Sequence, residues 1–191
     1  MIDIFEIEIL KDNEKKLKCT SKDHANDQYM TESLRMVVNF DGVKEQYIKI
    51  NNLSQISIKS VDALMQFKKD KPIIFVEFKN GIIFIEENPK NGNSTKKIIL
   101  DPEIEQEICD KAQDSLLVFN DIVGKNISYT RKNVDFILVY NYEKNSQRLK
   151  NSIRVKSMRF KFYKFKNIYF RNVTVCTKES FKKFLEKNNF I

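Results

Sequence analysis

The sequence is poor in the residues from which many hydrolytic and metal sites are built. It has one histidine, His24, and three cysteines that form no CxxC pair. Zinc enzymes, Ser-His-Asp hydrolases and His-Asn-His nucleases depend on such residues, so the composition argues against all three classes. Scattered cysteines also indicate a reducing compartment without a disulfide framework, and we expect a cytoplasmic protein.

Residues that make linkers and membrane spans are scarce as well. Only four glycines and three prolines occur among 191 residues, which argues against long flexible linkers. No run of about 18 apolar residues is present, so no membrane span is expected. Residues 1–10 mix acidic with apolar side chains, unlike a signal peptide. We expect residues 1–191 to form a single domain that is large enough to bury a core.

Two apolar runs joined by a short polar segment predict a β-hairpin. The runs extend from Val61 to Phe67 and from Pro72 to Phe78, and the polar segment 68–71 (KKDK) separates them. Short runs rich in Val, Ile and Phe on either side of a polar turn are typical of two paired strands. We place the centre of the turn between Lys69 and Asp70.

This turn fixes which residues of the two strands face each other. Asp62 then lies opposite Glu77, and Ser60 lies opposite Lys79, with Cβ atoms of facing residues about 5 Å apart. Side chains alternate along a strand, so Glu77 and Lys79 share one face. The hairpin therefore gathers two carboxylates and one ammonium on one face.

Two carboxylates that face each other on a sheet repel, which a purely structural strand would avoid. A divalent cation between them removes the conflict, and hard cations such as Mg²⁺ prefer oxygen ligands. Such a cation suits phosphodiester hydrolysis, because it activates a water molecule and neutralises charge on the phosphate. A neighbouring lysine can orient the nucleophile or stabilise the developing charge.

The spacing of these residues resembles the D…ExK core of the PD-(D/E)XK nuclease superfamily. Asp62 is followed by fourteen residues and then by Glu77-Phe78-Lys79, and Val61 occupies the position of the Pro in the family's name. The resemblance implies a restriction-endonuclease-like α/β fold, with a mixed central sheet flanked by helices. It also implies that Asp62, Glu77 and the Phe78 carbonyl bind Mg²⁺ or Mn²⁺, and that Lys79 assists the attacking water.

In that superfamily a first helix often supplies a further acidic residue. The apolar residues of Tyr29–Phe40 have near-helical spacing, which predicts this helix. Glu32 is the candidate catalytic acid on it, and Glu45 is the second choice. Helices that follow the ExK strand can also lend a polar residue to the site, and Lys111 is the candidate there.

A rival interpretation of the same region is a second hairpin. Asp41-Gly42 is a strong two-residue turn signal, and it lies between the apolar runs Met36–Phe40 and Val43–Ile50. A short helix that ends near residue 34 or 35 and leads into this hairpin would reconcile the two interpretations.

Other patterns complete the expected α/β order. Asp101-Pro102-Glu103 is a good helix start and Gly124 a reasonable stop. Val134–Tyr142 is apolar almost without alternation, which predicts a central strand covered on both faces. The weaker patterns predict a strand over Ile2–Leu10, loops over Glu86–Lys97 and Glu143–Asn151, and a last helix that begins at Thr177.

The positive charge is concentrated near the C-terminus. The chain has a net charge of +8, and the segment Lys144–Lys178 holds eleven Lys or Arg and no Asp or Glu. Basic and aromatic residues alternate within Ile153–Val175, which predicts an additional basic β segment with its phenylalanines in the core. Basic surfaces bind phosphate backbones with salt-dependent affinity and little sequence information. The candidates for this contact are Arg154, Lys156, Arg159, Lys161, Lys164 and Lys166.

These observations predict a metal-dependent phosphodiesterase that cleaves DNA or RNA. The alternative from another class is a catalytically silent nuclease-like fold. It would bind nucleic acid or inhibit a protein partner, as an immunity or anti-defence protein does. The sequence pI of about 9.2 counts against an inhibitor that covers a basic nuclease, because such inhibitors are expected to be acidic.

Overall fold

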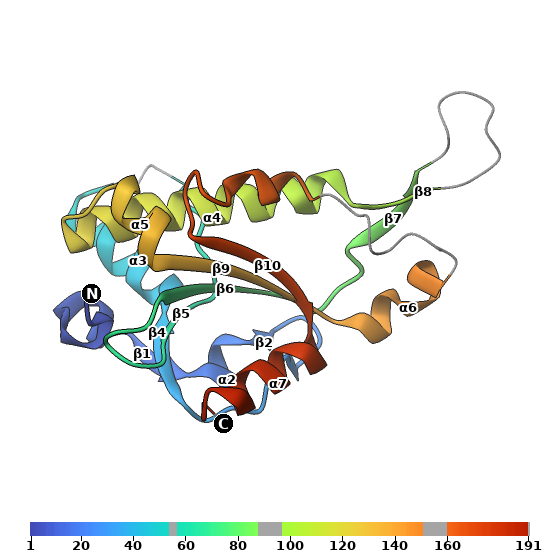
Figure 1. The fold of residues 1–191 in the computed structure, drawn as a ribbon, viewed down its shortest axis with the longest axis horizontal. Coiled ribbons are helices and arrows are strands. Elements are labelled where there is room, and N and C mark those ends of the chain that lie inside the picture. The colour runs from blue at the N-terminus through green and yellow to red at the C-terminus, as the bar shows by residue number, and fades with distance from the viewer. Residues whose placement is uncertain (54–56, 88–96, 151–159, 191) are drawn as a thin grey trace.

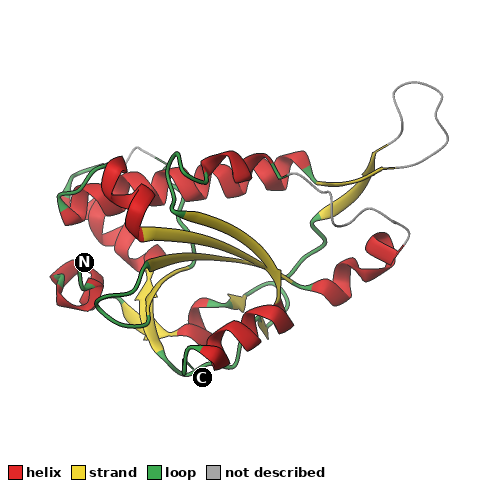
Figure 2. Ribbon diagram, viewed as in Figure 1, coloured by secondary structure: helices red, strands yellow, loops and turns green. Residues whose placement is uncertain are grey.

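A six-stranded mixed sheet forms the centre of the protein. The computed structural model describes residues 1–53, 57–87, 97–150 and 160–190. The strand order is β1-β4-β5-β6-β9-β10, and helices lie on both faces of the sheet (Figures 1 and 2). The predicted mixed α/β sheet flanked by helices is therefore confirmed.

The strands of the central sheet pair in two ways. The first four strands in the order pair antiparallel, whereas β9 is parallel to both β6 and β10. The six strands are β1 (Glu14–Lys16), β4 (Met36–Asn39), β5 (Ala63–Gln66), β6 (Ile73–Lys79), β9 (Val134–Tyr140) and β10 (Asn172–Thr177). Two small hairpins pair β2 (Lys22–Asp23) with β3 (Gln28–Tyr29) and β7 (Phe84–Glu87) with β8 (Lys97–Leu100).

The central sheet divides the core into two parts, and helices cover each of them. The α-helices are α1 (Glu8–Lys11), α2 (Leu17–Thr20), α3 (Phe40–Ile50), α4 (Pro102–Val123), α5 (Ile127–Asn133), α6 (Tyr142–Lys150) and α7 (Lys178–Lys187), and the 3₁₀ helices include η1 (Ile4–Glu6) and η3 (Lys161–Phe165). Residues of α3 and α4 pack on one face of the sheet, and residues of α2 and α7 pack on the other. Among the described helices, none is long and apolar enough to span a bilayer.

The predicted central hairpin is confirmed in its strands, its turn and its register. Ala63 pairs with Val76, and Gln66 pairs with Ile73, which is the register that a turn centred between residues 69 and 70 requires. Asp62 lies directly before β5, and its N–H donates to the Val76 carbonyl at 3.1 Å. Alternation along β6 sends Phe75 toward α4 and Val76 toward α7, because a strand presents successive side chains to opposite faces.

The long helix and the central strand were also predicted correctly. The Asp101 carboxylate accepts the N–H of Glu103 at 2.9 Å, Pro102 is the first helical residue, and Gly124 ends α4 with a left-handed φ of 59°. Strand β9 lies between β6 and β10 and is buried along most of its length. The last helix begins where expected, after Thr177.

Most of the N-terminal predictions were wrong, although the run Met36–Phe40 of the hairpin interpretation does form a strand, β4 (Met36–Asn39). Residues 2–10 form η1 and α1 instead of a strand, because the Asp3 carboxylate accepts the N–H of Phe5 and starts a helical turn. Neither a helix over Tyr29–Phe40 nor a hairpin around residues 41–42 forms. Strand β4 leads directly into α3, so Asp41 lies in the first helical turn, where the helix dipole favours an acid.

Gly42 has a packing reason for its place in α3. A Cβ at this position would collide with Asn13 Oδ1. Asn13 is itself held in place, because its Nδ2 donates to the Ile9 carbonyl and to Gln46 Oε1. Glycine at position 42 therefore permits a close approach that the turn interpretation did not anticipate.

The C-terminal predictions were partly wrong. Residues 142–150 form α6, where a loop was expected. The segment Lys161–Phe165 is a 3₁₀ helix, not a β segment, and a strand begins only at Asn172. Phe162 and Phe165 are three residues apart and share one side of this 3₁₀ helix, so both enter the core, as expected for the phenylalanines. Arg154, Lys156 and Arg159, like most of the expected loop over Glu86–Lys97, lie outside the described residues.

Candidate active site

Two carboxylates meet at the end of the central hairpin. Glu77 lies near the end of β6 on the face toward α4, and its side chain is fully buried. Asp62 lies beside it, with a side chain that is 18% exposed, and its Oδ2 accepts the N–H of Phe78 at 2.6 Å. The structure therefore brings together the two acids that the hairpin register placed opposite each other.

Two lysines neutralise part of this charge. Lys111 of α4 places Nζ 2.7 Å from Glu77 Oε1 and 3.9 Å from Asp62 Oδ1. Lys79 of β6 places Nζ 3.3 Å from Glu77 Oε1 and 2.9 Å from Glu107 Oε1. Lys111 thus spans both acids of the hairpin, while Lys79 joins Glu77 to the helix above it.

The position of α4 explains why these groups meet. Ile108 and Ala112 are buried against the sheet, which fixes the rotation of the helix. Glu107 and Lys111 are one helical turn apart and therefore share a side of α4 that borders this packed face. The sequence singled out Lys111 but not Glu107, since no local motif separates that residue from the other acids of the helix.

Burial and neighbouring charges shift the pKa values of the two carboxyls and of Lys111. Burial raises the pKa of Glu77, although Lys111 and Lys79 act against this effect. Burial, and then the charge of Glu77, raise the pKa of Asp62 well above its usual value. Burial alone would lower the pKa of Lys111, but the charges of Glu77 and Asp62 outweigh it and raise that pKa. The ammonium therefore stays protonated, and the two acids attract a further positive charge.

The residues present fit a hard divalent cation. Glu77 Oε2 is buried, and it has no hydrogen-bond partner among the described residues. Such an unpaired carboxylate oxygen beside a second carboxylate is a suitable ligand for Mg²⁺, which keeps several waters and needs only one or two carboxylates. No group of three or more His, Cys, Asp or Glu gathers around one point in the described part of the chain. Asp62 and Glu77 would thus be the side-chain ligands.

The side chain and the backbone N–H of Phe78 contact different parts of the structure. Its ring packs against Phe181 of α7, on the opposite face of the sheet from Glu77. Its N–H, by contrast, points toward Asp62. The N–H and C=O of one strand residue point to the same side of the strand. The Phe78 carbonyl therefore lies on the Asp62 side, as its predicted role requires.

Glu32, the acid predicted to lie on an N-terminal helix, lies in no helix and away from the two carboxylates. Glu32 is 74% exposed and pairs with Lys18 at 2.6 Å, and it lines neither of the hollows that adjoin Asp62. Asp41 of α3 instead accepts a 2.5 Å hydrogen bond from Ser60 Oγ, and its charge helps to raise the pKa of Asp62. Glu45 follows one turn later. The turn interpretation of residues 41–42 hid Asp41 as a candidate.

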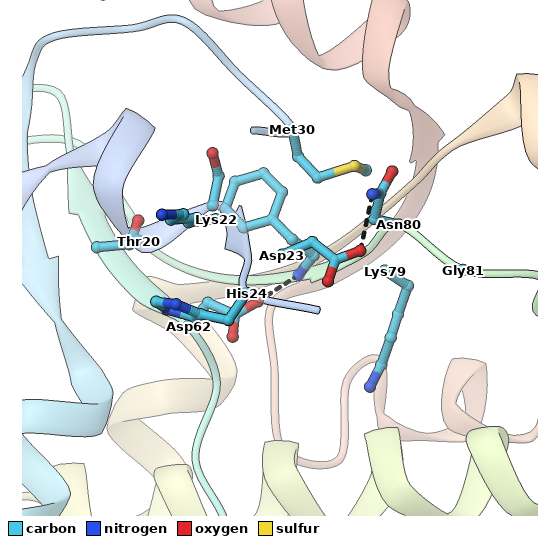
Figure 3. Close-up of a pocket in the computed structure, with 11 residues that line it drawn as sticks. Thr20, Lys22, Asp23, His24, Met30, Asp62, Lys79, Asn80 and Gly81 are labelled. Carbon is cyan, nitrogen blue, oxygen red and sulfur yellow. Dashed lines mark hydrogen bonds between the residues drawn. The ribbon is translucent and has the colours of Figure 1, made fainter. Parts of the chain in front are cut away.

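A pocket of about 300 Å³ opens over Asp62 (Figure 3). It lies between the end of β6 and the β2–β3 hairpin, and Figure 3 shows Lys79 extending away from that hairpin toward α4. The hairpin is tied to the sheet because Asn80 Nδ2 donates to Asp23 Oδ2 at 2.8 Å and Asn141 Nδ2 donates to Asn80 Oδ1 at 2.8 Å. The residues that border the pocket are therefore held in place by side chains at the end of β6.

The three predicted nucleic-acid contacts that fall among the described residues lie elsewhere. The 3₁₀ helix η3, which carries Lys161 and Lys164, packs beside α4, across the sheet from α2 and β2 (Figure 1). Lys161 pairs with Glu105 of α4 at 3.7 Å, and Lys164 and Lys166 are exposed. None of these three lysines lines the pocket over Asp62.

Comparisons with protein-family models, with curated proteins and with solved structures gave no significant match to this chain. The resemblance to the PD-(D/E)XK superfamily therefore rests on the residues and geometry described above.

Proposed function

We propose that this protein is a metal-dependent phosphodiesterase that cleaves nucleic acid. The observation that carries the proposal is the proximity of Asp62 and Glu77 at the end of β6, with Glu77 Oε2 buried and without a hydrogen-bond partner in the part of the chain that the structure describes. A buried acid in this state is costly in a structure that has no use for it. Two lysines at the same point supply the positive charge that a phosphodiester reaction needs.

The order of elements supports a restriction-endonuclease-like fold. Helix α3 precedes the antiparallel β5–β6 hairpin, α4 follows it, and the chain returns through the parallel strand β9. This order of hairpin, helix and buried strand is similar to the core of the superfamily. The proposal about chemistry is separate, because a fold does not fix a function.

The chain's own residues would divide the work. A Mg²⁺ or Mn²⁺ ion held by Asp62, Glu77 and the Phe78 carbonyl would activate water and neutralise charge on the phosphate. The Lys79 ammonium, anchored by Glu107, would orient the water through a hydrogen bond. Lys111 would leave Glu77 Oε1 when the cation arrives and would then face the anionic phosphate.

The test is cleavage by the wild type and two variants. Plasmid DNA, single-stranded DNA and RNA are incubated with Mg²⁺, Mn²⁺ or EDTA and with wild type, Lys79→Ala or Glu77→Gln. Lys69→Ala is the matched control, since Lys69 is 59% exposed and pairs with the surface acid Glu6, away from the site. We expect cleavage that needs metal, survives in the control and is lost in both site variants. Cleavage that persists in EDTA or in Glu77→Gln would overturn the proposal.

A second candidate function is a catalytically silent nuclease-like fold that binds nucleic acid or a protein. One observation favours it, because the Lys111 ammonium lies near both carboxylates and can itself neutralise part of their charge. Titration calorimetry with Mg²⁺ and Mn²⁺ separates the two candidates. Metal binding that disappears in Asp62→Ala supports the enzyme, whereas no metal binding by the folded wild type supports the silent fold.

A further inference from the structure

A second hollow adjoins the candidate active site. This groove has a volume of about 950 Å³ and is bordered by β1, α2, the β2–β3 hairpin and α3. Four residues line both the groove and the pocket over Asp62, so the two hollows meet at that acid. They are Thr20, Lys22, His24 and Asp62.

The walls of the groove carry cations supplied by three separate elements. Strand β1 supplies Lys15 and Lys16, β2 supplies Lys22, and the last turn of α3 supplies Lys49. Lys15, Lys16 and Lys49 are exposed. Lys22 pairs with Asp27, which is 84% exposed, and an ion pair of this kind is weak enough to be exchanged for a phosphate.

The acids that α3 contributes to the groove lie toward the end of the groove that is near Asp62. Three groove residues lie on successive turns of α3 and therefore form one stripe along its side, namely Asp41, Glu45 and Lys49. Asp41 is the end of the stripe near Asp62, because its carboxylate accepts a hydrogen bond from Ser60. The charge of the α3 wall thus changes from acidic beside the candidate active site to basic farther along the groove.

The groove also offers a surface for a base. Tyr29 lines it, and its ring has the ammonium groups of Lys18 and Lys22 at 4.7 and 5.7 Å from its centre. Aromatic rings beside cations are the usual means of holding unpaired bases and their phosphates. A hollow of this volume is in the range of pockets that enclose small ligands, about 300–1,000 Å³, which suits a few nucleotides of one strand.

We propose that this groove binds a single strand of nucleic acid and leads one of its phosphates to Asp62. The backbone of the strand contacts Lys15, Lys16, Lys22 and Lys49, and a base stacks on Tyr29. This inference rests on the proposed function, since it takes Asp62 as the point of reaction. It assigns binding to the N-terminal half of the chain, across the sheet from the basic residues of η3.

The experiment measures the binding of a fluorescein-labelled 12-nucleotide DNA strand by anisotropy in EDTA, at several salt concentrations. The groove variant is Lys15→Glu/Lys16→Glu/Lys49→Glu, and the α7 variant Lys182→Glu/Lys183→Glu/Lys187→Glu is a control with the same change of charge at exposed positions. A third variant reverses the charges of Lys161, Lys164 and Lys166. Circular dichroism verifies folding, and alanine replacements at the groove positions guard against a misfolded triple Glu variant.

We expect the groove variant to lose affinity by about tenfold or more, and its salt slope to fall by about 2, since three contacts to a single strand contribute about 0.7 each. The α7 control should keep its affinity within about threefold, because a change in net charge alone acts weakly through salt. Equal losses in groove and control variants would overturn the inference. So would a loss confined to the η3 variant, or binding of a DNA duplex as tight as that of the single strand.

Failure of this inference is distinguishable from failure of the proposed function. Binding in EDTA requires no cleavage, so a wild type that binds through the groove but cleaves nothing with Mg²⁺ refutes only the enzyme. A wild type that cleaves with Mg²⁺ and binds independently of the groove lysines refutes only the groove.

Discussion

Replacement of Lys111 by methionine is the sharpest test of how the buried acids are stabilised. Methionine keeps much of the aliphatic volume and removes the ammonium that lies 2.7 Å from Glu77 Oε1. Removal of one partner from a buried ion pair costs about 3–5 kcal/mol, because the other charge stays buried. Lys79 remains 3.3 Å from the same oxygen, so we expect the lower end of this range. In a chain of this length, a loss of about 3 kcal/mol lowers the melting temperature by roughly 6–12 °C.

The assay is thermal and urea unfolding at pH 7 in EDTA, with a matched control. Lys59 Nζ also lies 2.7 Å from a carboxylate, that of Asp110, but the two side chains are 43% and 33% exposed. Lys59→Met should therefore cost less than about 1 kcal/mol. The double variant Glu77→Gln/Lys111→Met should recover much of the lost stability, because no uncompensated charge remains in it.

Two results would refute this reasoning. One is a loss in Lys111→Met that is no larger than the loss in Lys59→Met, and the other is a double variant that is no more stable than the single one. Either would mean that Glu77 is protonated in the wild type and needs no ammonium. Under the metal-dependent proposal, Mg²⁺ also stabilises Lys111→Met more than the wild type, because the cation no longer competes with the ammonium.

Three further changes test other parts of the structure. The pKa of Asp62 is raised in the folded state, so the stability that this acid contributes is full at pH values below its usual pKa of 3.8. That contribution is lost as the pH rises through the folded-state pKa. Urea unfolding from pH 4 to 8 should thus show Asp62→Asn gaining stability relative to the wild type, and a constant difference would contradict this. Gly42→Ala displaces Asn13 and its hydrogen bonds, and it should lower the free energy of unfolding by about 1–2 kcal/mol. Gly81→Ala is the control, because its new Cβ enters open space and should change that free energy by no more than about 0.5 kcal/mol. Equal costs in chemical unfolding would argue against the close approach at position 42. Asn80→Ala unties the β2–β3 hairpin from β6, so hydrogen exchange in that hairpin should accelerate about tenfold, and unchanged exchange would mean that other contacts hold it.

The parts of the fold that the sequence predicted are those set by nearby residues. The hairpin register follows from the length of its turn, and a one-residue slip would send Glu77 to the opposite face. The ends of α4 follow from a capping aspartate and from Gly124, which adopts the left-handed conformation that glycine tolerates. In both cases the information lies within a few residues of the feature.

The parts that were missed depend on contacts between distant segments. Residues 41–42 have the composition of a tight turn, yet they start a helix whose first turn packs on Asn13. The basic segment around Lys161 alternates like a strand, yet its neighbouring phenylalanines enter the core from one side of a 3₁₀ helix. The same limit applies to the site, because Glu107 and Asp41 reach it only through the placement of α4 and α3.

The balance of charge at the end of β6 decides between the two functional proposals. A structural ion pair needs one acid for each base, and Lys111 with Glu77 would meet that need. Asp62 adds a second buried acid, and its pKa is raised first by burial and then by the charge of Glu77, so the two carboxyls oppose each other's ionisation. A silent fold would gain from the loss of either acid, because repulsion between them destabilises the sheet. A site that recruits a divalent cation would use both, and Glu77 Oε2, which has no hydrogen-bond partner among the described residues, would be available as a ligand. The mutual repulsion of these two buried acids is the physical reason to favour the metal-dependent proposal.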